Sequence, residues 1–153
     1  MDDLINFLVE ARRATYAIPH GTIVGDGTEQ MSYDRHEWRY RDRYAGHNPY
    51  GGHELVWHNG KVVWMKNYIA EVVSDRRPIS EIYDFQREVL GQPDPSHLMR
   101  GPAAYANGNY SYTNDIDGTL ERFSGHEQIF YDGKVVYRMT FHGGRIGHNG
   151  KNN

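Results

Sequence analysis

The spacing of apolar positions along the chain changes from the period of a helix to that of a strand. The apolar positions of residues 2–14 are Leu4, Phe7, Leu8 and Ala11. Their spacing of three or four residues predicts an amphipathic helix, and its acidic start and basic end suit the helix dipole. A second helix is expected to begin at Ser80, which can cap its first turn, and to stop before Gly91.

Alternating residues between and after these helices predict antiparallel strands. Residues 36–43 alternate between a charged set and a mostly aromatic set, which is typical of a strand with one aromatic face. The positions of that face are His36, Trp38, Tyr40 and Asp42. Strands at 54–58 and 61–73 are joined by Asn59-Gly60, which favours a two-residue type I′ turn. Asp132-Gly133 is expected to close an equivalent hairpin.

A stretch of the sequence occurs twice, at an offset of 73 residues. Gly52–Trp64 and Gly125–Tyr137 are identical at 7 of 13 positions and chemically similar at others. We interpret the chain as a single domain, 1–153, built from duplicated halves at about 1–75 and 76–148, with a flexible tail at 149–153. Two halves paired around a pseudo-twofold axis would enclose a groove.

These elements predict the α+β class. Each half would add a helix and an antiparallel hairpin to one sheet or open barrel of about six strands or more, covered by the two helices. Counting outward from the turns pairs Glu54 with Met65 and Glu127 with Arg138. Both hairpin faces carry apolar side chains, so both are expected to be covered, and which face lines the groove stays open.

Composition excludes several classes of protein. At 153 residues the chain is about one domain in size. It has no cysteine, which excludes disulfides and thiolate metal sites, and its formal net charge of -3 disfavours nucleic acid as a partner. The acidic start and the lack of a long apolar run predict a cytoplasmic protein without membrane contact. No glycine-rich phosphate loop is present, so no cofactor is expected.

Short motifs are spread over most of the chain. They are Thr15-Tyr16-Ala17, Tyr40 to Gly46, Gly52 to Val56, Asn59 to Trp64, Asn67-Tyr68, Arg100-Gly101-Pro102 and Phe141 to Gly144. Together they resemble an uncharacterised bacterial family of domains of unknown function, found alone and fused behind helix-turn-helix repressor domains. For the fused members, the resemblance implies effector sensing. Glu54 and Glu127 match the family's pattern, whereas His53 and His126 do not.

Glu54 and Glu127 are the candidate catalytic residues. They occupy equivalent positions of the repeat and would converge near the axis. Two carboxylates in a semi-apolar site raise the pKa of one of them and form an acid/base pair. For Glu127 the alternative is a structural ion pair with Arg138, whereas Glu54 opposite Met65 would have no such partner.

The 12 tyrosines and 3 tryptophans suit a cleft that is half apolar and half wet. Arg100, in a rigid Arg-Gly-Pro segment, could clamp an anionic group, cap helix carbonyls or pair with Glu54. The histidines lack the spacing of a metal site, so no metal is predicted. The candidate ligand-binding residues are Trp38, Tyr40, Tyr44, His53, Trp64, Tyr68, Arg100, Tyr112, His126 and Tyr137.

Three functions remain open. The first is a small-molecule binding protein with an aromatic, acid-containing cleft for an aromatic or cationic organic ligand. The second is a cofactor-independent isomerase, cyclase or hydrolase that uses Glu54 or Glu127 as acid/base. The third is a homodimeric interaction module whose aromatic groove is a subunit interface.

Overall fold

The computed structural model describes residues 3–16, 18, 20–92, 94, 97 and 99–149. Within these ranges the chain forms two helices, α1 (Asp3–Thr15) and α2 (Ile79–Leu90). The strands are β1 (Thr22–Ile23), β2 (Glu29–Arg35), β3 (Trp38–Gly46), β4 (Tyr50–His58), β5 (Lys61–Val72), β6 (Ala104–Asn107), β7 (Tyr110–Thr119), β8 (Arg122–Tyr131) and β9 (Lys134–Arg145). Of the tail expected at 149–153, residues 150–153 lie outside the described residues.

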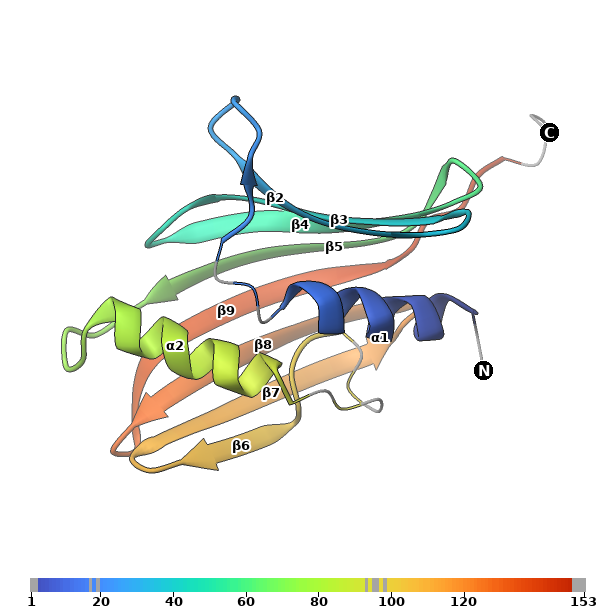
Figure 1. Ribbon diagram of the computed structural model, residues 1–153. Coiled ribbons are helices and arrows are strands. Elements are labelled where there is room, and N and C mark those ends of the chain that lie inside the picture. The colour runs from blue at the N-terminus through green and yellow to red at the C-terminus, as the bar shows by residue number, and fades with distance from the viewer. Residues whose placement is uncertain are drawn as a thin grey trace.

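One antiparallel sheet contains all of these strands. Their order is β1-β2-β3-β4-β5-β9-β8-β7-β6, so β5 and β9 lie side by side at the centre. Both helices lie against the same face of the sheet (Figure 1). The expected α+β class with an antiparallel sheet is confirmed, and the sheet is open rather than closed into a barrel.

The N-terminal boundaries differ from those predicted. In place of one strand at 36–43, a turn at His36-Glu37 separates β2 from β3, and His36 has a φ of 51°. Strand β2, at residues 29–35, precedes the predicted strand and was not predicted from the sequence. The N-cap of helix α2 lies two residues earlier than expected: it is Pro78, not Ser80, and no side chain caps the helix.

The two hairpins form at the predicted turns, but each contains a β-bulge. Asn59 and Asp132 have positive φ angles of 50° and 48°, as a type I′ turn requires. The bulges lie after Val56 and after Ile129.

Beyond each bulge the pairing shifts by one residue. Glu54 lies opposite Lys66, not Met65, and Glu127 lies opposite Met139, not Arg138. Both predicted pairings are wrong because a bulge sets two residues against one, so counting outward from the turn loses register.

The core lies between the helices and the sheet face that they cover. Its largest fully buried side chains include Trp64, Tyr40, Tyr112, Tyr137 and Phe7. Over the described residues no element covers the opposite face, where Ile69 on the central strand β5 is 61% exposed. The partner half does not cover this face, as one form of the prediction required, because the two halves extend one sheet side by side instead of stacking.

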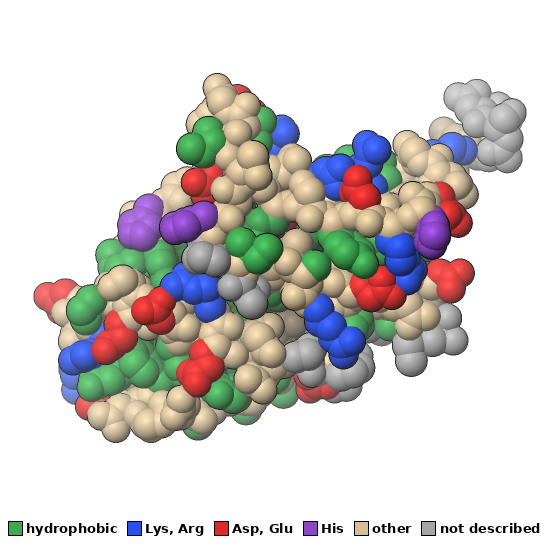
Figure 2. Space-filling model, in the orientation of Figure 1, with side chains coloured by type: hydrophobic (Ala, Val, Ile, Leu, Met, Phe, Trp, Pro, Cys, Tyr) green, Lys and Arg blue, Asp and Glu red, His purple; other side chains and the backbone are tan. Residues whose placement is uncertain are grey.

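The surface over the helices carries charges of both signs. Figure 2 shows acidic and basic side chains interspersed over this face, without a large area of one sign. In the described part of the chain, neither helix has the length and apolar character needed to cross a lipid bilayer.

Candidate functional site

Glu54 lies at the centre of a buried ionic cluster beneath α1. Its Oε2 is 2.8 Å from Lys66 Nζ and 3.3 Å from Arg12 Nη2. Its Oε1 accepts hydrogen bonds from the hydroxyls of Tyr16 at 2.5 Å and Tyr40 at 2.7 Å. Burial raises the pKa of Glu54, but the charges of Lys66 and Arg12 outweigh it and hold this pKa well below its usual range.

Glu127 has an equivalent environment in the second half. Arg100 donates to both of its oxygens, from Nε at 3.0 Å and Nη2 at 3.1 Å. Tyr112 and Tyr137 also donate to it, at 2.6 and 2.9 Å. The pKa of Glu127 is lowered, because Arg100 and these hydrogen bonds outweigh the effect of burial.

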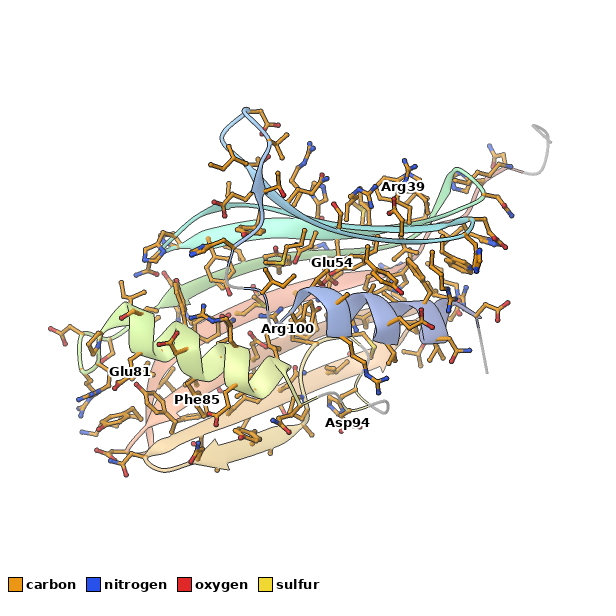
Figure 3. The ribbon with its side chains drawn as sticks, in the orientation of Figure 1. Arg39, Glu54, Glu81, Phe85, Asp94 and Arg100 are labelled. Atoms are coloured by element: carbon orange, nitrogen blue, oxygen red, sulfur yellow. The ribbon has the colours of Figure 1, made fainter. Side chains whose placement is uncertain are left out.

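These clusters correct two predictions. Neither glutamate has the raised pKa expected of an acid/base pair, since each has its own buried cation. The expected ion pair of Glu127 with Arg138 is absent, because Arg138 lies on the uncovered face and pairs with Glu71 at 2.6 Å. Figure 3 shows Glu54 and Arg100 in the layer between the helices and the sheet.

A cavity of about 340 Å³ lies beside this layer, on the covered face. Strands β2 to β5, helix α2 and residues that follow each helix contribute to its wall. The aromatic part of the wall consists of Tyr16, Tyr44, Tyr50, Tyr68 and Tyr83. Glu54 does not line the cavity, although Tyr16, which does, hydrogen-bonds to it.

Asp42 is the most deeply buried carboxylate of the cavity wall. It is 8% exposed, and its Oδ1 accepts a hydrogen bond from Tyr68 at 2.6 Å. Burial, together with the negative charge of Glu54, raises the pKa of Asp42 to about 6, against the opposing effects of Tyr68, Lys66 and Arg100. A buried carboxyl group with a raised pKa beside a cavity is typical of functional sites.

The tyrosines of the wall support one another. The ring of Tyr50 lies edge-on to those of Tyr68 and Tyr83, with centroid distances of 6.2 and 5.8 Å. Gln86 on α2 donates to the Tyr50 hydroxyl at 2.9 Å. The Arg100 guanidinium lies 5.3 Å from the centroid of Tyr16 and so connects the wall to the Glu127 cluster. The wall is therefore held in place by both halves of the chain.

The ten candidate ligand-binding residues separate into three groups. Tyr44, Tyr68 and Arg100 line the cavity. Tyr40, Tyr112 and Tyr137 are buried donors to the two glutamates, and Trp64 is buried with its Nε1 3.3 Å from the Leu120 carbonyl oxygen. Away from the cavity, Trp38 stacks on His58 at 4.1 Å, and His126 is exposed and pairs with Asp115. His53 is half-buried. Because it is next to Glu54 in strand β4, its side chain points to the opposite face of the sheet.

Asp42, Tyr16, Tyr50 and Gln86 line the cavity but were not among the sequence candidates. A signal for Asp42 was present, since it is a charged residue on the aromatic face of an alternating strand. Tyr16 belongs to one of the motifs that carry the family resemblance, but no local pattern assigns it or Gln86 to a cavity, because their contacts with the sheet depend on how the helices pack.

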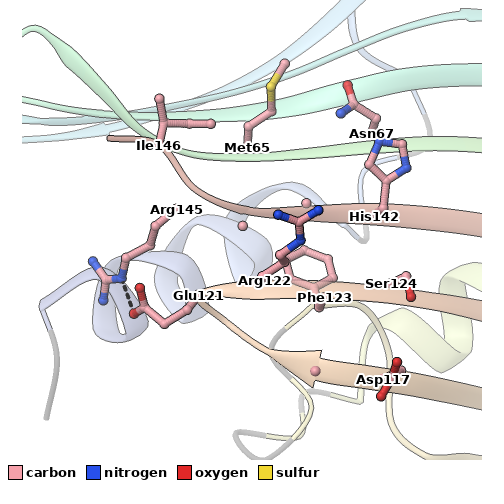
Figure 4. A pocket seen from close by; sticks show the side chains of 13 residues that line it. Met65, Asn67, Asp117, Glu121, Arg122, Phe123, Ser124, His142, Arg145 and Ile146 are labelled. Atoms are coloured by element: carbon pink, nitrogen blue, oxygen red, sulfur yellow. Dashed lines mark hydrogen bonds and ion pairs between the residues drawn. The ribbon is translucent and has the colours of Figure 1, made fainter. Parts of the chain in front are cut away.

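A second hollow, of about 750 Å³, lies on the uncovered side of the sheet (Figure 4). Most of its lining side chains, such as Asn67, Ser124 and His142, are exposed or half-buried, and its Arg145 pairs with Glu121. No buried carboxylate lines it. We therefore take the smaller cavity as the candidate site. Among the described residues no group of three or more His, Cys, Asp or Glu side chains is placed to bind a metal ion.

Comparison with known proteins identifies one match. A family model described as "Domain of unknown function (DUF5680)" matches residues 42–146. This range contains Asp42, both buried glutamates and Arg100, whereas α1 and Tyr16 precede it. No curated protein and no solved structure matches the chain significantly.

Proposed function

This chain belongs to the DUF5680 family of domains of unknown function, and we propose that it is a small-molecule binding domain whose site is the cavity beside Asp42. The observation that carries the proposal is the composition of the wall: five tyrosines surround a carboxylate that is more than nine-tenths buried. Small-molecule sites combine aromatic surface with a few polar groups in this way.

The arrangement supports binding because the wall is held in place before any ligand arrives. The buried ionic clusters fix Tyr16 and Arg100, and Gln86 fixes Tyr50. A wall already in its binding conformation reduces the entropy lost when a ligand binds. In family members fused to repressor domains, which the sequence resemblance implies, an occupied cavity would be the effector signal.

A panel of small amines, carboxylic acids and neutral aromatic compounds tests this proposal by ligand-observed NMR. Met31→Trp should fill the cavity and abolish binding, whereas the control Met65→Trp places the same bulk in the second hollow and should leave binding intact. If no compound binds, or if Met65→Trp alone abolishes binding, the assignment of this cavity is wrong.

We also propose that the two halves derive from a duplicated unit. In support, β5 pairs with β9 so that Tyr68 lies opposite Phe141, two positions that are 73 residues apart. The bulges after Val56 and Ile129 have the same separation. An alignment of family members tests the idea, because duplication requires the repeated hairpin in both halves. If every member of the family has this hairpin in only one half, the idea of a duplication is wrong.

A second candidate is an enzyme that uses Asp42 as a general base. The raised pKa of Asp42, about 6, favours this reading, because a base works best when its pKa is near the pH of the reaction. The reaction class would be a cofactor-independent isomerisation, cyclisation or hydrolysis. Once a ligand is known, Asp42→Asn separates the two functions: an enzyme loses turnover of a neutral substrate but still binds it.

A further inference from the structure

We propose that the cavity ligand is a small organic ammonium ion, bound through its positive charge by Asp42 and Glu29 and enclosed by the tyrosine rings. This inference rests on the proposed binding function and specifies the class of ligand. It starts from the charged side chains of the wall, which are two carboxylates, Asp42 and Glu29, and two guanidinium groups, Arg87 and Arg100.

The two arginines of the wall already have carboxylate partners outside the wall. Arg100 forms its two hydrogen bonds with Glu127, at 3.0 and 3.1 Å, and Arg87 pairs with Asp84 on α2. An anionic ligand would have to compete with these carboxylates for the same donors. The geometry of the wall therefore disfavours an anion.

The carboxylates of the wall have neutral partners instead. Asp42 accepts from Tyr68 at 2.6 Å, whereas Glu29 acts on the neutral Tyr44, whose pKa burial and Glu29 together raise to about 12. Within the described part of the chain neither carboxylate forms an ion pair. Because an ammonium group donates hydrogen bonds and carries a full positive charge, it is the partner that such carboxylates lack.

The aromatic rings favour the same class of ligand. A cation within about 6 Å of a tyrosine ring is attracted to the negative face of the ring. Lys66 Nζ already lies 5.7 Å from the Tyr16 centroid and 6.0 Å from the Tyr68 centroid, so the rings left for a ligand cation are those of Tyr44, Tyr50 and Tyr83. Ile18, Met31 and Leu90 add apolar surface for a short hydrocarbon or aromatic body.

The ionised form of Asp42 is the form that would bind a cation. The charged groups that act on it are Glu54 from β4, Lys66 from β5 and Arg100 from the segment after α2. Together with ionised Asp42, these three groups have a net charge of zero. When Asp42 is protonated, the net charge of the four is +1. Acid should therefore release the ligand. His20 and His47 also line the cavity and would repel a cation if protonated.

Three probes of matched shape test the ligand class: 2-phenylethylamine, 2-phenylethanol and 3-phenylpropanoate. At pH 7.5 we expect the amine to bind at least about tenfold more tightly than the alcohol, and the carboxylate to bind most weakly. Asp42→Asn keeps an acceptor for Tyr68 and should remove most of the preference for the amine over the alcohol, and Asp42→Asn/Glu29→Gln should remove the rest. The control Asp34→Asn removes a carboxylate that pairs with Arg41 away from the cavity and should change neither affinity.

The outcomes separate this inference from the proposed function. If the alcohol or the carboxylate binds as tightly as the amine, and Met31→Trp still abolishes that binding, the cavity is a binding site but the ligand class is wrong. If the amine does not bind, the inference is overturned, and the wider panel decides separately whether the cavity binds anything.

A titration of the unmodified protein provides a second test that does not depend on a variant folding. The affinity for the amine should fall as the pH decreases through about 6, while the affinity for the alcohol stays constant. The double variant His20→Gln/His47→Gln should keep this dependence. The role of Asp42 would be contradicted if the affinity for the amine stayed constant or rose as the pH decreased. It would also be contradicted if the affinity of the double variant no longer depended on pH.

Discussion

Replacing Glu54 with Gln should strongly destabilise the protein. Glu54 is fully buried and compensates two buried cations, Lys66 and Arg12, which the substitution leaves without their counter-charge. Removing one partner of a buried ion pair costs about 3 to 5 kcal/mol. For a chain of this size, each kcal/mol lowers the melting temperature by about 2 to 4 °C, so we expect a decrease of about 6 to 20 °C.

Urea unfolding at pH 7, followed by circular dichroism, measures this loss. Glu121→Gln is the control, because that carboxylate pairs with Arg145 at the surface and should cost less than about 1 kcal/mol. The double variant Glu54→Gln/Lys66→Met removes both charges of the closest pair. It should be about 1 to 3 kcal/mol more stable than Glu54→Gln alone, because an uncompensated charge costs more than an absent pair.

The pH dependence has a definite sign. Because the pKa of Glu54 in the folded protein lies below the ordinary value of 4.5, its ionisation stabilises the fold above that pH, and the stabilisation is lost as the pH falls further. Glu54→Gln should therefore flatten the acid limb of the stability curve. A loss below about 1 kcal/mol at pH 7, or a double variant no more stable than the single one, would refute the argument that Glu54 compensates buried charge.

Three further predictions concern stability. Asp42→Asn should stabilise the ligand-free protein at pH 7 by about 1 to 3 kcal/mol, because the pKa of Asp42 is raised from 3.8 to about 6 on folding. The penalty for ionising Asp42 builds up between these two pKa values and is constant above them, so chemical denaturation at pH 4 and 7 should show the gain mainly at pH 7. Trp64→Ala should lower the free energy of unfolding by about 3 to 5 kcal/mol, because Trp64 is fully buried, and Trp57→Ala should lower it much less, because Trp57 is half-buried. If urea unfolding showed the larger loss for Trp57→Ala, the core would lie on the other face. Gly52→Ala should lower the melting temperature strongly, since its Cβ would lie 2.2 Å from a carbonyl oxygen of β3, whereas Gly147→Ala has open space and should not.

The sequence predicts the elements of this fold that depend on local interactions. Apolar spacing located both helices to within a residue or two, and Asn59-Gly60 and Asp132-Gly133 located both hairpin turns. Strand β2 was missed because its residues, Glu29 to Arg35, are mostly polar and form a strand only by pairing with β3.

The site was less predictable because its residues come together through non-local contacts. The equivalence of Glu54 and Glu127 was readable from the repeat, and both are buried. Their partners were not readable, since the bulge sets Lys66 opposite Glu54 and the segment after α2 brings Arg100 to Glu127. Consequently the two glutamates that resembled an acid/base pair are compensated charges, and the buried acid that lines the cavity is Asp42.

The position of β9 has a consequence for synthesis of the protein on the ribosome. This strand is the last of the described strands, yet it is hydrogen-bonded between β5 and β8 at the centre of the sheet. Until residues 134–145 emerge, β5 presents an unpaired edge, and such edges pair readily with other chains. The sheet can be completed only after residues 134–145 have been made. A nascent chain stalled in the second half is therefore expected to aggregate or to require a chaperone.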